Sequence, residues 1–424
     1  MNKFLNKIFF RSNNHNYISQ AIKDLSFNTP VKKIFNAINN HSDSSEIRYV
    51  GGCIRKIIKK EKVDDIDLAT NLNPKEVISA LNKNSLNFYE TGIEHGTITA
   101  VVDDYKFEIT SLREDIKNDG RYAEVKFSND WKKDAARRDF SINSIYADIN
   151  GNLFDPFNGK KDLEEGLIRF IGSPEKRIQE DYLRILRYIR FFLKYSSQKH
   201  DQAILRIIKK NLNGISNLSK DRIFDELKKL IKSKVLEQLS NDRHSTELIE
   251  IIFPQIKNIK IFKNLNLFAK TKINECDIIF LLSLLIIDSS DNMDFFIYKF
   301  NISKKEQKRL KNINDIINGK FSPTPFTEKN LNKFFYYKGK EAVVDAISYK
   351  LFVSKKIDKK LINFLDNFNS KVVPVMPINA KILMSKYNIP EGKILGIKLK
   401  MIEEQWVDNN FNLSDKQISK IVGN

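Results

Sequence analysis

Residues 63–70, VDDIDLAT, decide the fold together with residues 49–55, YVGGCIR, which precede them. In VDDIDLAT, Asp65 and Asp67 alternate with apolar residues. Because alternate residues of a β-strand face the same side, the pattern predicts a strand with both carboxylates on one face. Neighbouring carboxylates repel each other, and Mg²⁺ relieves this repulsion because it binds one or two protein carboxylates together with water and phosphate oxygens. The pair therefore suits two-metal phosphoryl transfer, although an acidic surface turn would show the same pattern.

In YVGGCIR, an apolar strand is expected to end at Gly51 and Gly52 and to lead into a basic helical turn at residues 54–60. Glycine lets the backbone approach a triphosphate closely, and the start of a helix presents free N–H groups. Arg55 can add a charge-assisted contact. Taken alone, the segment is equally an ordinary turn between a strand and a helix. Followed by the acidic strand, it describes a nucleotide cradle that faces a metal site.

Length, charge and cysteine content limit the class of protein. The 424 residues suffice for about two to four subdomains, and the net charge of +19 suits a polyanionic partner, although a bias towards Lys, Asn and Ile can arise without one. No apolar run reaches the roughly 20 residues that cross a bilayer, and residues 278–287, IIFLLSLLII, are expected to form a buried helix. The start of the chain does not resemble a secretory signal, and two cysteines make no disulfide framework. A cytoplasmic protein is expected.

The chain changes character along its length. Between about residues 48 and 170, short β-rich segments alternate with turn signals, and a helix is predicted at residues 74–83 with Asn73 as its N-cap. From about residue 174 onward, apolar residues recur at helical spacing. The sequence therefore predicts an α/β (α+β) head with a mixed β-sheet, followed by an all-helical remainder.

Four segments in this order resemble the bacterial class II CCA-adding and poly(A) polymerase group of the polymerase-β-like nucleotidyltransferase superfamily. They are VGGCIR (50–55), DDIDLAT (64–70), ARRDFSINSIYADINGNLFDPFNGKKDLEEGLIRFIG (136–172) and RIQEDYLRILRYIRF (177–191). The resemblance covers about residues 48–192 and is weaker at residues 389–411. It implies an N-terminal lead (1–30), a nucleotidyltransferase head (31–172), a helical neck that selects the base (173–235) and a helical body and tail that bind tRNA (236–424).

The resemblance implies that Asp65 and Asp67 bind two Mg²⁺ ions, one at the RNA 3′-hydroxyl and one at the incoming triphosphate. A third catalytic carboxylate is expected on a neighbouring strand. Glu108 in YKFEITSL is the best match, since alternate residues around it are apolar. A structural salt bridge is the other interpretation of Glu108.

Further nucleotide-binding residues follow from the same resemblance. Arg138 would reach the nucleotide, Asp139 would organise the site, and Asn143 would hold a sugar or backbone group. Arg113 and Arg121 are expected near the nucleotide or the primer. Without the neighbouring motifs, adjacent arginine and aspartate residues would more simply form a surface ion pair.

The base-selecting element is expected in RIQEDYLRILRYIRF, where Asp181 and Arg184 would share one face of a helix. A carboxylate accepts the exocyclic amino hydrogen of C or A, and a guanidinium donates to the ring acceptors of both bases. G and U present the reverse pattern, so the pair would select CTP and ATP without a template. Arg187 and Arg190 continue the stripe and resemble residues that contact the triphosphate. A simple helix salt bridge is the alternative.

The sequence thus predicts addition of C, C and A to the tRNA 3′ end from CTP and ATP. A poly(A) polymerase and a relative that adds only CC or only A remain open, because all of them use the same head chemistry. A catalytically idle RNA-binding protein is a third possibility, against which the intact acidic and basic motif residues argue. The partner is tRNA, for which recurring lysine pairs suit phosphate recognition. No membrane or obligate protein partner is indicated. The sequence leaves open the oligomeric state, the switch from C to A and the role of Asp64.

Overall fold

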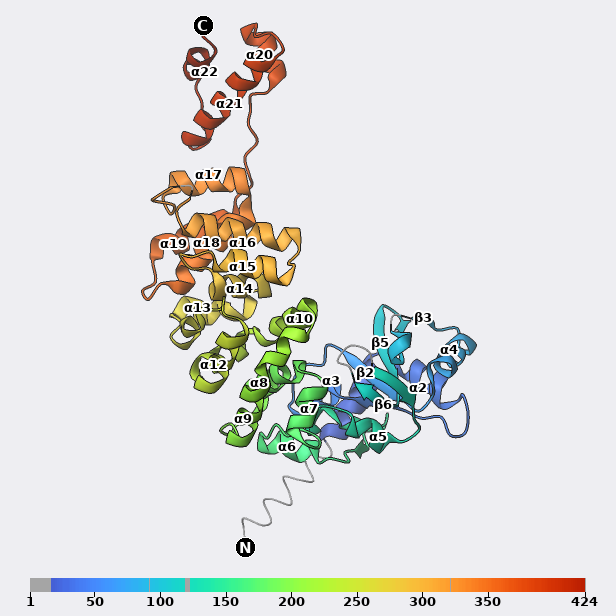
Figure 1. Cartoon of the computed structure of the whole chain (residues 1–424). Coiled ribbons are helices and arrows are strands. Elements are labelled where there is room, and N and C mark those ends of the chain that lie inside the picture. Colours follow the sequence, from blue (N-terminus) through green and yellow to red (C-terminus); the bar gives the residue numbers. More distant parts are fainter. Residues whose placement is uncertain (1–16, 91, 119–122, 321, 424) are drawn as a thin grey trace. The chain divides into compact units, whose positions relative to one another are not determined.

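The structure is a computed structural model that describes residues 17–90, 92–118, 123–320 and 322–423 (Figure 1). The chain divides into two compact units, Met1–Glu226 and Leu227–Asn424. Within the described residues every β-strand belongs to the first unit, and the second is helical. This confirms the predicted fold class. The domain boundaries expected at residues 30, 172 and 235 stay predictions.

The first unit is built on a seven-stranded sheet with the order β3-β4-β5-β2-β1-β8-β9. The central pair β2 and β5 is parallel, and the remaining pairs of this sheet are antiparallel, so the sheet is mixed. Its strands are β1 (Ile47–Val50), β2 (Ile66–Thr70), β3 (Asn87–Tyr89), β4 (Thr97–Val102), β5 (Tyr105–Ser111), β8 (Tyr146–Ala147) and β9 (Leu153–Phe154). A separate two-stranded ribbon joins β6 (Arg113–Asn118) and β7 (Ala123–Phe127).

One face of the sheet is covered by helices, and the other carries the acidic residues. Leu68 of β2 and Phe107 of β5 pack into a core with side chains of α2, α3 and α4. Because side chains alternate along a strand, Asp67 and Glu108 project from the opposite face. The helices and 3₁₀ turns of the head are residues 17–28, α2 (Val31–Asn39), α3 (Gly52–Ile58), α4 (Pro74–Lys83), η1 (Ile93–His95), α5 (Trp131–Ala136), η2 (Ser141–Asn143) and α6 (Gly159–Glu165).

The start of α4 forms as its sequence predicts. The Asn73 side chain accepts hydrogen bonds from the backbone N–H groups of Lys75 and Glu76. The Glu76 carboxylate in turn accepts from the Asn73 backbone N–H at 2.8 Å. This reciprocal capping satisfies donors that have no partner inside the helix.

The expected helix around the base-selecting residues is interrupted. After the head, the chain forms α7 (Pro174–Glu180), α8 (Leu183–Tyr195), α9 (Gln202–Asn211), η3 (Leu212–Asn217) and α10 (Lys220–Leu230). Asp181 lies between α7 and α8 in an extended conformation, with φ −155° and ψ 104°. Its carboxylate accepts a hydrogen bond from the Leu183 backbone N–H at 3.1 Å. The prediction that Asp181 and Arg184 share one helix face is therefore wrong, because the aspartate satisfies a donor at the start of α8 instead of continuing α7.

The second unit is helical in its described residues. Its elements are α11 (Ser233–Asn241), α12 (Arg243–Ile252), η4 (Ile259–Lys263), α13 (Leu267–Lys272), η5 (Ile273–Glu275), α14 (Ile278–Ile286), α15 (Asn292–Phe300), α16 (Lys304–Ile317), α17 (Glu328–Lys338), α18 (Lys340–Val353), α19 (Lys359–Ser370), α20 (Ala380–Tyr387), α21 (Lys393–Asp408) and α22 (Asp415–Val422). The apolar run at residues 278–287 forms the buried helix that was expected, α14. Among the described residues, no helix combines the length and the apolarity that a bilayer crossing requires.

Candidate active site

The three predicted carboxylates lie along the two central strands. Asp65 is exposed immediately before β2, and Asp67 is half-buried within it. Glu108 lies opposite Asp67 in the parallel ladder between β2 and β5. Burial raises the pKa of Asp67 above its usual value. The negative charge of Glu108, and to a smaller extent that of Asp65, raises it further. A divalent cation bound beside these carboxylates would reduce their mutual repulsion.

These residues fit a metal that takes few protein ligands. No three His, Cys, Asp or Glu side chains are gathered into a ready metal cluster in the part of the chain that the structure describes. Mg²⁺ typically keeps several waters and uses substrate phosphates in addition to one or two carboxylates. Asp65 and Asp67 therefore suit Mg²⁺ bound together with a nucleotide better than a cation enclosed by protein alone.

The Gly51-Gly52 turn brings the backbone close to these groups. A Cβ atom on Gly52 would lie 3.4 Å from Asp67 Oδ2, and one on Gly51 would lie 3.8 Å from Arg138 Nη1. Gly51 has φ +67°, a conformation that side-chain-bearing residues rarely adopt. The turn thus lies between the acidic strand and Arg138, close to both.

Arg138 is held by a buried acid that the sequence reasoning missed. The Asp134 carboxylate, 1% exposed, accepts hydrogen bonds from the Tyr146 hydroxyl at 2.6 Å and from Arg138 Nε at 3.2 Å. Burial alone would raise the pKa of Asp134, but the charges of Arg138 and Arg137 outweigh it and lower the pKa to about 2. The i,i+4 spacing of Asp134 and Arg138 was a signal in the sequence that could have identified this pair.

A chain of polar contacts links the head to α8. Asn143 Oδ1 accepts a hydrogen bond from Arg55, and Asn143 Nδ2 donates to Asp139 Oδ1 at 2.8 Å. Asp139 Oδ2 accepts from Arg187 Nε at 2.6 Å. Burial raises the pKa of Asp139, but the Arg187 charge and these hydrogen bonds overcome the effect and lower the pKa to about 2. The structure thus brings together four of the residues that the sequence singled out.

The two proposed base-reading residues have separate partners. Asp181 Oδ2 accepts a hydrogen bond from Arg222 of α10 at 2.8 Å. Arg184 donates to the Glu180 carboxylate at 2.7 Å. Arg184 also helps to lower the pKa of Asp139, so it lies near the polar chain described above. Asp181 and Arg184 therefore have different partners and do not pair with each other as helix neighbours.

The remaining predicted arginines differ in how they are placed. Arg190 is paired with the buried carboxylate of Glu226 at 2.5 Å. Arg113 begins β6 and donates to the backbone carbonyl of His95. Arg121 lies outside the described residues.

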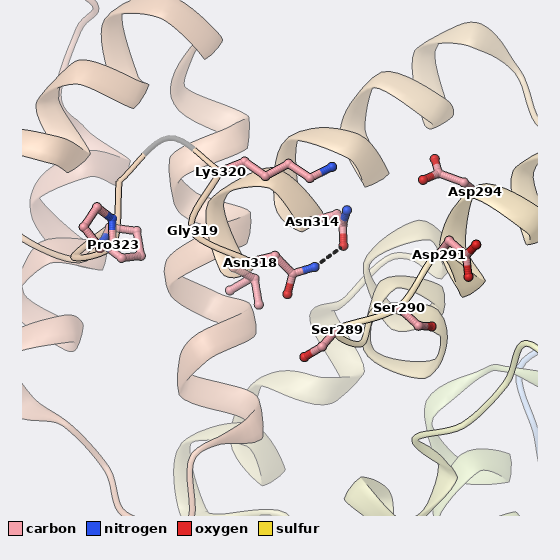
Figure 2. A pocket seen from close by; sticks show the side chains of 11 residues that line it. Ser289, Ser290, Asp291, Asp294, Asn314, Asn318, Gly319, Lys320 and Pro323 are labelled. Atoms are coloured by element: carbon pink, nitrogen blue, oxygen red, sulfur yellow. Dashed lines mark hydrogen bonds between the residues drawn. The ribbon is translucent and has the colours of Figure 1, made fainter.

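A cavity of about 630 Å³ lies in the second unit (Figure 2). Asp291 and Asp294, at the start of α15, and Lys320, after α16, line it. At the end of α16, which also lines the cavity, the Asn318 side chain donates to Asn314 Oδ1 at 2.8 Å. None of the predicted nucleotide-site residues lines this cavity.

Comparison with known proteins adds independent information. Residues 47–169 match the family model described as the poly A polymerase head domain. Residues 201–260 match the model described as a probable RNA and SrmB-binding site of polymerase A. The first match contains every predicted head residue of the site.

Two animal proteins and one bacterial crystal structure are similar to this chain. The mitochondrial CCA tRNA nucleotidyltransferase 1 of Mus musculus is 32% identical over 399 residues, which cover 89% of this chain and 86% of that protein. Its Danio rerio counterpart is 39% identical over 211 residues, 49% of this chain and 47% of the relative. The crystal structure of the Bacillus stearothermophilus CCA-adding enzyme in complex with CTP has a TM-score of 0.70 at 20% identity and covers 93% of this chain and 97% of its own. The last similarity shows that the fold is shared.

Proposed function

Because the chain belongs to the CCA-adding enzyme and poly(A) polymerase family of nucleotidyltransferases, we propose that it adds C, C and A to the 3′ end of tRNA from CTP and ATP. The observation that carries this proposal is the acidic pair Asp67 and Glu108, in register on neighbouring strands of the sheet and beside the Gly51-Gly52 turn. The tRNA substrate and the nucleotide sequence added come from the names of the relatives.

Family members generally need a metal ion, and the finer proposal is two Mg²⁺ ions held by Asp65 and Asp67. Bound there, the ions would supply Lewis-acid stabilisation of the charge that develops during phosphoryl transfer. Glu108 contributes a further negative charge beside Asp67. A cation at this place would offset the burial and the charge of Glu108 that raise the pKa of Asp67.

The arginines of the site bind and neutralise the triphosphate. Arg55, Arg138 and Arg187 approach from α3, from the turn after α5, and from α8. Each is partly or largely buried and held by polar partners, so it does not have to be ordered when the nucleotide arrives. Guanidinium groups stabilise the extra charge of the pyrophosphate leaving group by charge-assisted hydrogen bonds.

Asp181 and Arg184 read the base edge. The Asp181 carboxylate accepts the exocyclic amino hydrogen of C or A, and Arg184 donates to the neighbouring ring acceptor. Arg222 donates a hydrogen bond to Asp181, and Glu180 accepts one from Arg184, so both side chains have ordered partners. G and U would leave a buried donor or acceptor unpaired, at a cost of about 1–3 kcal/mol each.

The proposal is tested with purified protein, Mg²⁺, tRNA that lacks its 3′ CCA, and each labelled nucleotide. We expect incorporation of CTP and ATP only, with extension that stops after CCA; the length and order are read by gel and sequencing. Unbounded A tails would instead show a poly(A) polymerase, and C-only or A-only products would show a partial activity. A chain that binds the tRNA without incorporating any nucleotide would be an idle RNA-binding protein.

Substituting Asp181 tests the base-reading role. Asp181→Ala is expected to reduce the preference for CTP and ATP over UTP and GTP by about tenfold to a hundredfold, because a wrong base no longer confronts an unpaired acceptor. The KM for CTP should rise by less than this factor, since the triphosphate contacts are unchanged. Competition between labelled nucleotides measures the preference. An unchanged preference would remove Asp181 from the base-reading site.

The cytoplasm is proposed as the compartment. Cys53 and Cys276 are both free thiols, which supports a reducing environment. Cell fractionation with an antibody against the chain would test this. Because the two animal relatives are named as mitochondrial proteins, the mitochondrial fraction should be probed as well, and signal there instead of in the cytosol would contradict the proposal.

A further inference from the structure

The ring of Phe191 in α8 is in contact with three guanidinium groups. Its centroid lies 4.1 Å from the guanidinium carbon of Arg190, 4.7 Å from that of Arg55 and 5.5 Å from that of Arg187. A cation within about 6 Å of an aromatic ring is attracted to its negatively polarised face. Phe191 is only 2% exposed, so water screens this attraction weakly.

The three arginines are unequally neutralised. Arg187 and Arg190 have carboxylate partners, whereas Arg55 donates to the neutral side chain of Asn143. Arg55 is buried, with 8% of its surface exposed, and its Nε has no hydrogen-bond partner among the described residues. Burial lowers the pKa of Arg190, and the positive charges of Arg187 and Arg55 lower it further. The carboxylate of Glu226 has the opposite effect, which is smaller than theirs combined. The cluster therefore keeps a positive charge that an anionic ligand can neutralise.

The ring also completes a circle of contacts between the head and α8. One half is polar and runs from Arg55 through Asn143 and Asp139 to Arg187. The other half is Phe191, which lies beside both end arginines. Among the described residues, Arg55, Arg187 and Arg190 each form a hydrogen bond through one nitrogen, which alone holds the guanidinium plane loosely. The ring face removes that freedom, because a guanidinium plane that leaves it loses the cation–π attraction.

We propose that Phe191 is a positioning residue for the nucleotide triphosphate, which holds Arg55, Arg187 and Arg190 together as one anion-binding surface. This inference rests on the proposed function and deepens it. It assigns to Phe191 a role in triphosphate affinity that is independent of the base, since none of the base-reading pairs involves its ring. An aliphatic side chain of similar size would fill the space but would not attract the cations.

Phe191→Met is the informative variant, and Phe170→Met is its matched control. Phe170 is also buried and packs on Tyr188 and on Phe140, whose ring in turn contacts Phe191. No cation–π contact to Phe170 is present among the described residues. Equilibrium binding of CTP and of CMP to the full chain with Mg²⁺ is measured by calorimetry. For Phe191→Met we expect the Kd of CTP to rise at least about tenfold, which is about 1.4 kcal/mol, and the Kd of CMP to rise by less than about threefold. The Kd of ATP should rise by the same factor as the Kd of CTP.

The outcome separates positioning from packing. Equal losses for CTP and CMP, or the same loss of CTP affinity in Phe170→Met, would overturn the proposal and leave Phe191 as a packing residue. If Phe191→Met does not fold, Phe191→Tyr decides, because it keeps the ring face: CTP affinity within about threefold of the unaltered chain supports the proposal, and a tenfold loss contradicts it. These measurements need no turnover. Failure of the unaltered chain to extend tRNA would refute the proposed function without deciding the role of Phe191.

Discussion

Replacing Asp67 by asparagine is expected to lower nucleotide transfer by at least about a thousandfold, which corresponds to about 4 kcal/mol of transition-state stabilisation. Asparagine keeps the size of the side chain in β2 but removes the negative charge that a metal ion requires. The half-buried position beside Glu108 should accept the neutral side chain without loss of stability, since burial and that neighbour already disfavour the charge of Asp67. Single-turnover extension of tRNA that lacks CCA measures the effect.

Asp64→Asn is the matched control for this experiment. Asp64 precedes Asp65 directly, and its exposed carboxylate is paired with Lys56 at 3.0 Å. Its removal should change transfer by less than about threefold, because exposed ion pairs contribute little. Binding of tRNA, measured by filter retention, should stay unchanged in both variants. Transfer by Asp67→Asn at a near-normal rate would show that the metal assignment is wrong.

Asp139→Asn is expected to have the largest effect on stability. The substitution leaves the largely buried Arg187 without its anion, and breaking a buried ion pair in this way costs about 3–5 kcal/mol. The midpoint of thermal unfolding should fall by about 10 °C. Transfer should decrease as well, since Arg187 and Asn143 both lose the group that orients them. Calorimetry and the extension assay measure the two effects.

This loss should depend on pH. The folded pKa of Asp139 is about 2, below its ordinary value of 3.8. The ionised carboxylate therefore stabilises the fold fully above about pH 4, and this contribution, about 2–3 kcal/mol, disappears as the pH falls towards 2. The difference in unfolding free energy between the original chain and Asp139→Asn should shrink over the same interval. A difference that stays constant down to pH 2 would contradict the depressed pKa.

Asp345→Asn provides the control for activity. Asp345 is a buried carboxylate of the second unit, where it accepts two hydrogen bonds from Arg309 at 2.7 and 3.0 Å. Its loss should lower stability while the chemistry in the head continues. Transfer that falls equally in Asp139→Asn and Asp345→Asn, under conditions in which both remain folded, would mean that Asp139 acts through stability alone.

Local sequence patterns were sufficient for the fold class and for the acidic face. Alternation of polar and apolar residues around Asp67 and Glu108 determines which side chains enter the core, because the two faces of a strand differ in their access to water. The N-cap at Asn73 and the buried helix α14 follow from equally local rules. Each of these features depends on residues within a few positions of one another.

Only the tertiary structure decided which charges meet. Helical spacing predicted that Asp181 and Arg184 would be neighbours, whereas Asp181 lies between α7 and α8 and pairs with Arg222, 41 residues away. The proximity of Phe191 to Arg55 is of the same kind, since the two belong to different helices. Such contacts depend on how helices and strands pack against each other. The periodic pattern of one helix carries no information about which other helix will pack against it. The sequence by itself thus determined two features: a glycine turn at Gly51 and Gly52, and after it a strand that carries Asp65 and Asp67 at its start. Packing of α3 and α8 determined which arginines surround the site, because long-range charge pairs form only where the hydrophobic core brings their helices together.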